Sequence, residues 1–345
     1  MPPSADDDDT TGVEVTPMMS VRGGPGGLIH QPIHESLTLA ALINGNFGVA
    51  SGTTVDNASN HDWEYIRGAV WNDDPSCLLF DRSSEYNHKY ALGSAWCIAY
   101  TKGASEWSDF DSRRLKNPTG RSHYGDLQFL HCMASESKEP AAETKRKVMA
   151  WLEVMYKLAN GEDGITAQTK PTDTKLKEFC PVGSLPPSWE TFSYYLSANS
   201  GFEGLDIGRR ALGSMFHIIQ DSYAIGHTRR TPLNREDRIS ENPLVYKSGT
   251  TDRWGAIENF HTYGGQDENL HSHYDHPNDK LPDPGNLGDL SQFDGLIGCR
   301  MAVEKCQGLL KLKQAGTKWK EGVEAYLDGD VFALSPTASP ANNEV

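Results

Sequence analysis

Apolar residues recur every three or four positions along several segments of this chain, a spacing that predicts amphipathic helices. The pattern is clearest over residues 143–158, where Val, Met, Trp, Leu and Tyr side chains share one face and Gly161 follows as a stop signal. The same spacing, with capping or breaking residues at the ends, predicts helices over residues 32–43, 62–71, 204–226, 300–313 and 318–327. Because helical patterns dominate and no internal repeat is visible, we expect an all-α protein with a single helical-bundle domain and long loops.

Composition divides the chain into an arm, one domain and a tail. Residues 1–26 carry an Asp run and then a Gly-rich stretch, which predicts a flexible, solvated arm. Residues 27–333 are expected to form the domain, and the Ser-, Pro- and Asn-rich residues 334–345 a disordered tail. Within the domain, the polar and aromatic segment 75–120 predicts a long functional loop, and residues 161–190 predict an exposed excursion.

The net charge of −15 narrows the range of partners. An acidic protein repels polyanions, so we expect no stable nucleic acid partner. No run of about 18 apolar residues is present, which predicts that there is no transmembrane segment. The acidic N-terminus is unlike a Sec signal peptide, so secretion would need another route or a signal already removed. The six cysteines include no CxxC pair and are too sparse for a disulfide scaffold.

Two pairs of histidine and aspartate carry the candidate chemistry. His217 and Asp221 lie four residues apart, so a helix places both on one face, and His227 follows shortly after. His271 and Asp275 repeat the same spacing. Imidazole and carboxylate groups bind zinc in water-accessible sites, which need three or four of them to converge. The repeated pair therefore predicts a metal site.

Other candidate ligands are weaker signals when each is taken alone. His30 and His34 flank the start of the helix expected at residues 32–43. An Asp73-Asp74-Pro motif is more often a turn than a ligand, because Asp side chains accept bonds from turn amides. His131 ends an apolar, strand-like patch, where a histidine is more often a hydrogen-bonded core residue. Only the whole set favours a metal centre.

In chain order, this set resembles the zinc-dependent phospholipase C and single-strand-specific nuclease superfamily. The resemblance runs from about residue 28 to 280 and implies an all-helical, trinuclear zinc phospholipase C-like fold. The matching motifs are Trp-x-Asp at Trp71 and Asp73, Leu-His at Leu130 and His131, the His-Asp-His spacing at His217, Asp221 and His227, and Asn-Leu-His-Ser from Asn269 to Ser272 with the carboxylate of Asp275.

Carried over by position, the resemblance implies three Zn2+ sites. The implied ligand sets are Asp73, His131, His217 and Asp221 for one zinc, His227, His271 and Asp275 for a second, and His34 with a bridging Asp221 for the third. Family members complete the third site with an N-terminal tryptophan, which this chain lacks before His34. We expect His30 to replace it; the alternatives are a processed terminus or only two metals. His123, His261, His273 and His276 are reserve candidates.

The resemblance implies a zinc-dependent phosphodiester hydrolase, because metal ions activate water and neutralise phosphoryl oxygens. The acidic charge favours a phospholipase C that acts on phosphatidylcholine-type lipid at a membrane or micelle surface and releases diacylglycerol and a phosphorylated head group. Asp73 and Asp221 are the expected catalytic residues; Arg229 and Arg230 could contact phosphate, although an exposed pair is the plainer interpretation. The alternatives are a single-strand-specific nuclease or 3′-nucleotidase, and a non-catalytic, metal-stabilised interaction protein.

Overall fold

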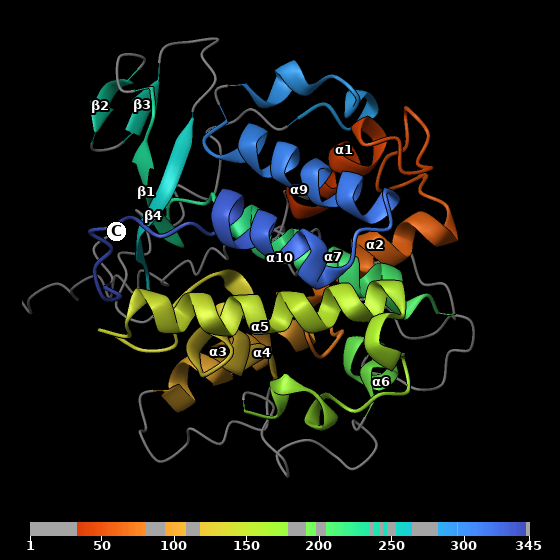
Figure 1. Ribbon diagram of the computed structural model, residues 1–345, viewed down its shortest axis with the longest axis horizontal. Coiled ribbons are helices and arrows are strands. Elements are labelled where there is room, and N and C mark those ends of the chain that lie inside the picture. The colour runs from red at the N-terminus through yellow and green to blue at the C-terminus, as the bar shows by residue number, and fades with distance from the viewer. Residues whose placement is uncertain are drawn as a thin grey trace, which may run out of the picture.

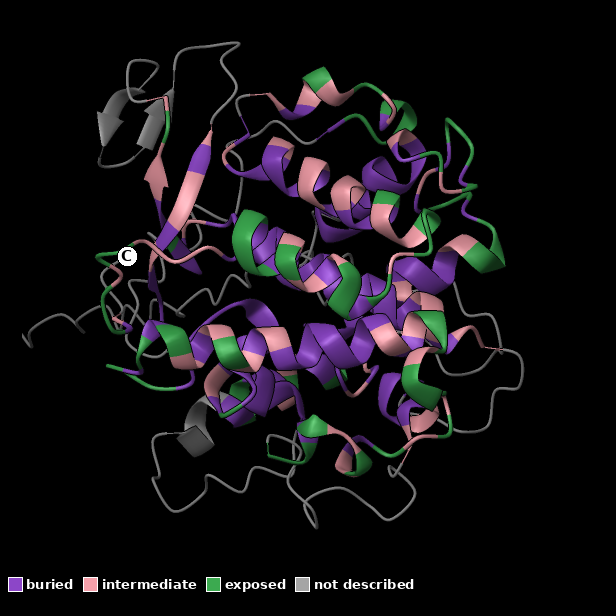
Figure 2. Ribbon diagram, viewed as in Figure 1, coloured by how far each residue is buried: buried purple, intermediate pink, exposed green. Residues whose placement is uncertain are grey.

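Helix α7, Ile207–Asp221, is the element around which the other helices of this computed structural model pack (Figure 1). It contacts α1, α2, α5, α6 and α9. Every residue from Arg210 to Asp221 is buried, and Figure 2 shows buried residues, in purple, concentrated in the middle of the helical part of the molecule. The structure describes residues 33–79, 94–107, 118–178, 191–197, 205–234, 238–241, 244–246, 253–263, 282–294 and 296–342.

The described part of the chain is mostly helical, which confirms the expected fold class at that level. The described α-helices other than α7 are α1 (Ile33–Asn44), α2 (Asn60–Trp71), α3 (Ser94–Trp107), α4 (Pro118–Tyr124), α5 (Ala141–Asn160), α6 (Phe192–Ser197), α9 (Cys299–Gln314) and α10 (Val323–Tyr326). Shorter 3-10 turns are η3 (Gln128–His131), η4 (Glu162–Gly164), η5 (Pro171–Asp173), η6 (Lys175–Glu178), η9 (Pro284–Asn286), η10 (Leu290–Phe293) and η11 (Trp319–Glu321), and η12 (Leu327–Val331) is a π-helix.

Helices with a clear apolar stripe lie where the sequence predicts them. Helix α5 covers residues 143–158 and ends at Gly161, whose φ of 63° is the left-handed conformation that favours glycine at a helix end. Helix α7 is shorter than the helix expected over residues 204–226. It begins after Asp206, whose side chain accepts a bond from the Arg209 amide at 3.0 Å, and it ends at Asp221.

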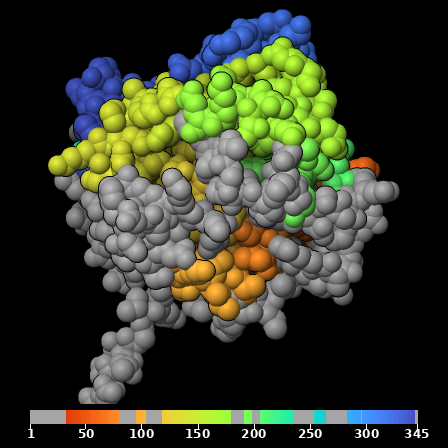
Figure 3. All heavy atoms as spheres, turned by 90° about the horizontal axis from the view of Figure 1, so that it is seen from below, coloured from red at the N-terminus to blue at the C-terminus, as the bar shows by residue number. Residues whose placement is uncertain are grey.

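The segment 75–120 is not the continuous loop that was expected. It contains α3 and the start of α4, which cross closely: a Cβ on Gly103 would lie 2.4 Å from the Cα of Gly120. The prediction of a strand-like patch that ends at His131 is likewise wrong, because these residues fold as α4 and η3. Short helices with small residues at their contacts leave no clear apolar period, so the pattern missed them. Helix α3 reaches the surface, where it forms part of the orange area in Figure 3.

Two small antiparallel sheets add to the helices and were not expected. Strand β1, Thr228–Pro232, pairs with β4, Trp254–Phe260, and β2, Arg238–Glu241, pairs with β3, Leu244–Tyr246. Strand β1 begins one residue after His227, so the first sheet continues from the end of the α7 segment.

The C-terminal segment, expected to be disordered, is placed against β4 as far as Asn342. Leu334 bridges Ile257, and the amide of Ser335 donates to the Ile257 carbonyl at 2.8 Å. Ala341 is buried and exchanges backbone bonds with residues 138 and 139. Its polar composition suggested a solvated tail, but these backbone groups find partners in the domain.

Glycines bring α2 and α7 unusually close together, which positions the candidate site. A Cβ on Gly213 would lie 2.2 Å from the Tyr65 carbonyl, and a Cβ on Gly68 would lie 2.1 Å from the Arg210 carbonyl. Arg210 also donates to the buried carboxylate of Glu64 at 2.5 Å. The backbones therefore touch, and the chain leaving α2 reaches the last turns of α7.

Candidate metal centre

The last turn of α7 presents His217 and Asp221 on one face, as the spacing of four residues predicts. The Nε2 atom of His217 lies 2.8 Å from Oδ2 of Asp221. Both side chains are fully buried. Helix geometry alone accounts for this pair, because residues i and i+4 stack along the axis.

Three more histidines reach Asp221 from separate segments. His34 comes from the first turn of α1, His131 from the end of η3, and His227 from the turn before β1. Their distances to Asp221 are 3.4 Å from His34 Nε2 to Oδ1, 3.1 Å from His131 Nδ1 to Oδ2, and 3.5 Å from His227 Nδ1 to Oδ2. One carboxylate thus lies within 3.5 Å of nitrogens from four imidazoles.

Backbone carbonyls fix the orientation of two of these rings. His217 Nδ1 lies 2.7 Å from the Ala69 carbonyl oxygen, and His227 Nδ1 lies 2.7 Å from that of His131. A carbonyl only accepts, so each Nδ1 carries a proton, which leaves Nε2 as the nitrogen that could bind a metal ion. Metal-binding histidines show this arrangement of the outer nitrogen.

Gln220 orients His34 in a comparable way. Its Oε1 lies 2.6 Å from His34 Nδ1, and its amide nitrogen donates to Thr38 Oγ1 at 3.0 Å. The His34 ring stacks on that of His217, with centroids 3.9 Å apart. These contacts direct Nε2 of His34 towards Asp221.

Burial keeps three of the imidazoles neutral, those of His34, His131 and His217. It lowers the pKa of His34 to about 3, with the neighbouring His217 as the next cause, and burial alone accounts for the lowering of the His217 pKa to about 3. The pKa of His131 is held well below its usual value by burial and then by His123. Neutral rings offer the lone pairs that a metal ion requires.

Asp73 rather than Asp74 faces the cluster. Asp73 Oδ1 lies 3.8 Å from His131 Nδ1, and its Oδ2 lies 3.9 Å from His217 Nδ1. Asp74 Oδ2 instead accepts a bond from the Leu79 amide at 2.7 Å, as a turn residue does. The Trp-x-Asp spacing and the geometry therefore select the same residue.

A buried amide and hydroxyl, neither singled out from the sequence, hold three of the ligand-bearing elements together. Asn72 donates to the Leu130 carbonyl at 2.6 Å and accepts from Ser214 Oγ at 2.7 Å. Ser214 Oγ also accepts from the Trp151 indole at 3.0 Å. This network joins α2, η3 and α7 next to their ligands. No spacing rule points to it, because its members are far apart in the chain.

His123 joins the cluster although it was only a reserve candidate. It is buried in α4, and its Nε2 lies 3.9 Å from Asp73 Oδ1. Within the described residues, two groups bring one donor atom from each member within 4.8 Å of the others: His34, His217 and Asp221, and Asp73, His123 and His131.

The donor chemistry fits a metal of the zinc type. Imidazole nitrogens and carboxylate oxygens are ligands that zinc accepts, and all members of both groups are buried. His131 Nε2 is also buried and makes no hydrogen bond to the described residues. These groups could therefore hold a metal ion.

Arg229 and Arg230 lie on a strand, where successive side chains point to opposite faces. Arg229 is exposed and pairs with Glu258 at 3.1 Å. Arg230 is buried, with its guanidinium 4.1 Å above the Tyr223 ring. It donates to the backbone carbonyls of Ser222, Gly255 and Val331. Arg230 therefore stabilises these backbone segments instead of making the phosphate contact considered for it.

Four histidines and one aspartate that were named as candidates lie outside the described residues: His30, His271, Asp275, His273 and His276. His261 is described and sits at the end of β4, where its amide donates to the His227 carbonyl at 2.9 Å. It therefore supports the His227 segment through its backbone.

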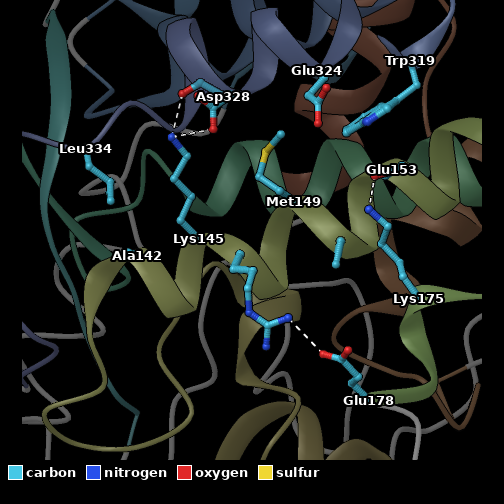
Figure 4. Close-up of a pocket in the computed structure, with 12 residues that line it drawn as sticks. Ala142, Lys145, Met149, Glu153, Lys175, Glu178, Trp319, Glu324, Asp328 and Leu334 are labelled. Atoms are coloured by element: carbon cyan, nitrogen blue, oxygen red, sulfur yellow. Dashed lines mark hydrogen bonds and ion pairs between the residues drawn. The ribbon is translucent and has the colours of Figure 1, made fainter.

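A surface groove of about 570 Å³ runs between α5 and the C-terminal helices (Figure 4), and none of its lining residues belongs to the cluster. Ion pairs join charged residues that line it. Lys145 lies 2.8 Å from Asp328, Arg146 lies 3.0 Å from Glu178, and Lys175 contacts Glu153. These pairs tie elements of the fold together, so the buried cluster remains the candidate functional site.

Comparisons with protein-family models, curated proteins and solved structures gave no match. Among the described helices, none is both long and apolar enough to cross a membrane. The case for function therefore rests on the buried cluster of histidines and carboxylates.

Proposed function

We propose that this protein is a zinc-dependent phosphodiester hydrolase. The observation that carries the proposal is the convergence of four imidazoles on Asp221. With the proton of His217 on Nδ1, its Nε2 lone pair and Asp221 Oδ2 are two acceptors 2.8 Å apart. Acceptors at that distance repel each other, and a shared cation would remove the repulsion more fully than a single proton on His131 Nδ1, which lies 3.0 Å from that nitrogen and 3.1 Å from that oxygen.

The chain offers two carboxylates with different roles. Bound zinc would lower the pKa of water and neutralise charge on the phosphoryl oxygens. Asp221, at the end of α7, would be a ligand common to two zinc ions, as the resemblance implies. Asp73, beside His131, would accept the proton of the attacking water. The burial of these groups strengthens each of their electrostatic interactions.

The substrate class we propose is a phosphatidylcholine-type glycerophospholipid, cleaved to diacylglycerol and a phosphorylated head group at a membrane or micelle surface. The net charge of −15 supports this choice, because it repels nucleic acid and does not repel a zwitterionic lipid. Cleavage of single-stranded DNA is the alternative outcome of the assay.

A paired assay tests the function. The purified protein, loaded with zinc, is given phosphatidylcholine micelles or single-stranded DNA, with and without a chelator. We expect chelator-sensitive release of phosphocholine and a fall in turnover of about 100-fold or more in Asp221→Asn, since losing one electrostatic group costs about that much. His61→Ala, at an exposed histidine in α2, is the matched control and should keep wild-type turnover.

Chelator-sensitive DNA cleavage without lipid cleavage would replace the phospholipase by a nuclease. Metal binding without either activity would leave a metal-stabilised interaction protein. Activity that survives complete metal removal would overturn the hydrolase proposal itself.

A further inference from the structure

His123 is the buried histidine at the edge of the cluster to which the proposed mechanism gives no role. Its Nε2 lies 3.9 Å from Asp73 Oδ1, and its ring centroid lies 4.8 Å from that of His131. The three side chains bring donor atoms within 4.8 Å of one another. Helix α4 and residue 123 lie outside the motifs that carry the family resemblance.

The tautomer of His123 directs a lone pair at Asp73. Its Nδ1 lies 2.8 Å from the Thr119 carbonyl oxygen, one helical turn earlier. Since a carbonyl only accepts, Nδ1 carries the proton and Nε2 of the neutral ring is an acceptor. His217 and His227 show the same arrangement, with Nδ1 at 2.7 Å from a backbone carbonyl in each.

The separations suit ligands of one ion better than a direct hydrogen bond. Asp73 Oδ1 lies 3.9 Å from His123 Nε2 and 3.8 Å from His131 Nδ1, both beyond hydrogen-bond range. His131 Nδ1 is itself within that range of Asp221 Oδ2 and His217 Nε2, at 3.1 and 3.0 Å. Two ligands of a tetrahedral zinc with bonds of about 2.0–2.1 Å lie roughly 3.3 Å apart. A shift of about half an ångström would bring these donors to ligand spacing.

Aromatic rings hold His123 in this orientation. Trp96, Tyr100 and Tyr263 lie nearly perpendicular to it, at interplanar angles of 82°, 80° and 83°. The indole of Trp96 also donates to the Asp73 carbonyl at 2.9 Å, which ties α3 to the same carboxylate residue. The ring is therefore fixed in place before any ion binds.

We propose that His123 is a metal ligand, and that Asp73, His123 and His131 form one ion site beside the group of His34, His217 and Asp221. The inference rests on the proposed function only in taking the cluster to be a metal centre. It assigns Asp73 and His131 to a different ion from His217, unlike the arrangement that the resemblance implies.

Two substitutions distinguish a ligand from a packing residue. His123→Phe keeps an aromatic ring among aromatic neighbours but removes the donor, and His123→Gln keeps a donor atom at the end of a side chain of similar reach. A ligand role predicts that zinc affinity falls in the order wild type, Gln, Phe. The loss for Phe should be at least about 100-fold, more than the ~10–100-fold typical of losing an outer-sphere partner. A packing role predicts the reverse order of the two variants.

The readouts are zinc affinity by chelator competition, zinc content per chain, and the visible spectrum of the cobalt-substituted protein. His123→Phe should lose one equivalent of zinc and change the cobalt spectrum, whereas His61→Ala should do neither. Circular dichroism shows that each variant is folded. If folded His123→Phe keeps the wild-type zinc content, affinity and cobalt spectrum, the inference is wrong.

Failure of this inference can be told apart from failure of the proposed function. If the wild-type protein binds zinc but cleaves no phosphodiester, the proposed function is wrong. The zinc measurements on His123→Phe then still decide whether His123 is a ligand. If the wild-type protein hydrolyses phosphodiesters and His123→Phe keeps its zinc content unchanged, His123 is not a ligand and the proposed function stands. A wild-type protein that binds no metal removes both.

Discussion

Ser214 and Asn72 show how much of the candidate centre depends on residues that bind nothing themselves. Their side chains are fully buried and hydrogen-bonded to each other at 2.7 Å, and Asn72 also donates to the Leu130 carbonyl, next to His131. Groups outside the ligand shell set the orientation of metal ligands, so their loss lowers the affinity for the metal ion.

Ser214→Ala should therefore weaken both the fold and the metal site. The substitution leaves the Asn72 carbonyl and the Trp151 indole without their shared hydroxyl, at a cost of about 1–3 kcal/mol in the free energy of unfolding. Zinc affinity should fall by about 10-fold or more. Urea denaturation of the metal-free protein and chelator competition measure the two effects. Ser51→Ala, at an exposed serine, is the control, and equal behaviour of the two variants would contradict the prediction.

At the scale of single residues, the sequence predicts those candidate ligands that lie close to one another along the chain. His217 and Asp221 were found because both lie within one helix, where four residues make one face. His123 is a weaker prediction because its partner Asp73 lies fifty positions earlier and no periodicity links the two. Asn72 gave no signal at all, since a buried amide is recognised only by what surrounds it.

Among the elements, the crossing of α2 and α7 decides whether the ligands meet. Gly68 and Gly213 remove the side chains that would hold the two backbones apart. The carbonyl of Ala69 can then orient His217 at 2.7 Å, and Asp73 follows two residues after the end of α2. A helical bundle with ordinary spacing would separate these groups.

Gly213→Ala should push α2 away from α7. The new Cβ would lie 2.2 Å from the Tyr65 carbonyl, which is backbone and cannot turn aside. Overpacking of this kind costs about 1–3 kcal/mol, and the shift should also lower zinc affinity by separating Asp73 from His217. Thermal denaturation and zinc content measure both effects.

Gly329→Ala is the matched control for that experiment, because a Cβ there meets nothing within 4 Å. The idea fails if Gly213→Ala retains wild-type stability and metal content. Long amphipathic helices such as α5 are predictable from the sequence, whereas the crossing of α2 and α7 is not. Glycines inside a helical pattern indicate a destabilised helix, and nothing in the pattern indicates a close contact there.

At the scale of the whole molecule, the C-terminal segment closes the edge of the first sheet. Its backbone bonds to the β4 strand at Ile257, to Thr262 and to residues 138 and 139. Asn259 donates to the Ser339 hydroxyl at 3.0 Å. Composition predicted disorder here because it reports what side chains favour and says nothing of a partner for the backbone.

Removal of residues 335–345 should lower the midpoint of thermal unfolding by about 5–10 °C. The estimate follows from the loss of several backbone bonds, each contributing about 1 kcal/mol. Differential scanning calorimetry of the full and shortened chains measures it. A change smaller than that of an unrelated surface substitution such as His61→Ala would show that the segment adds nothing to stability.

The hydrogen bond between His34 and Gln220 also bears on how the protein forms. These residues are 186 positions apart, so the bond closes a very long loop and can exist only after α1 has docked on α7. Contacts of such high sequence separation arise late in folding, since the entropy of closing the loop is lost before they form. An ion that needs both His34 and Asp221 thus meets a complete site only on a chain that has finished folding. Once bound, it opposes the first separation of α1 from α7 and so slows unfolding more than it speeds folding.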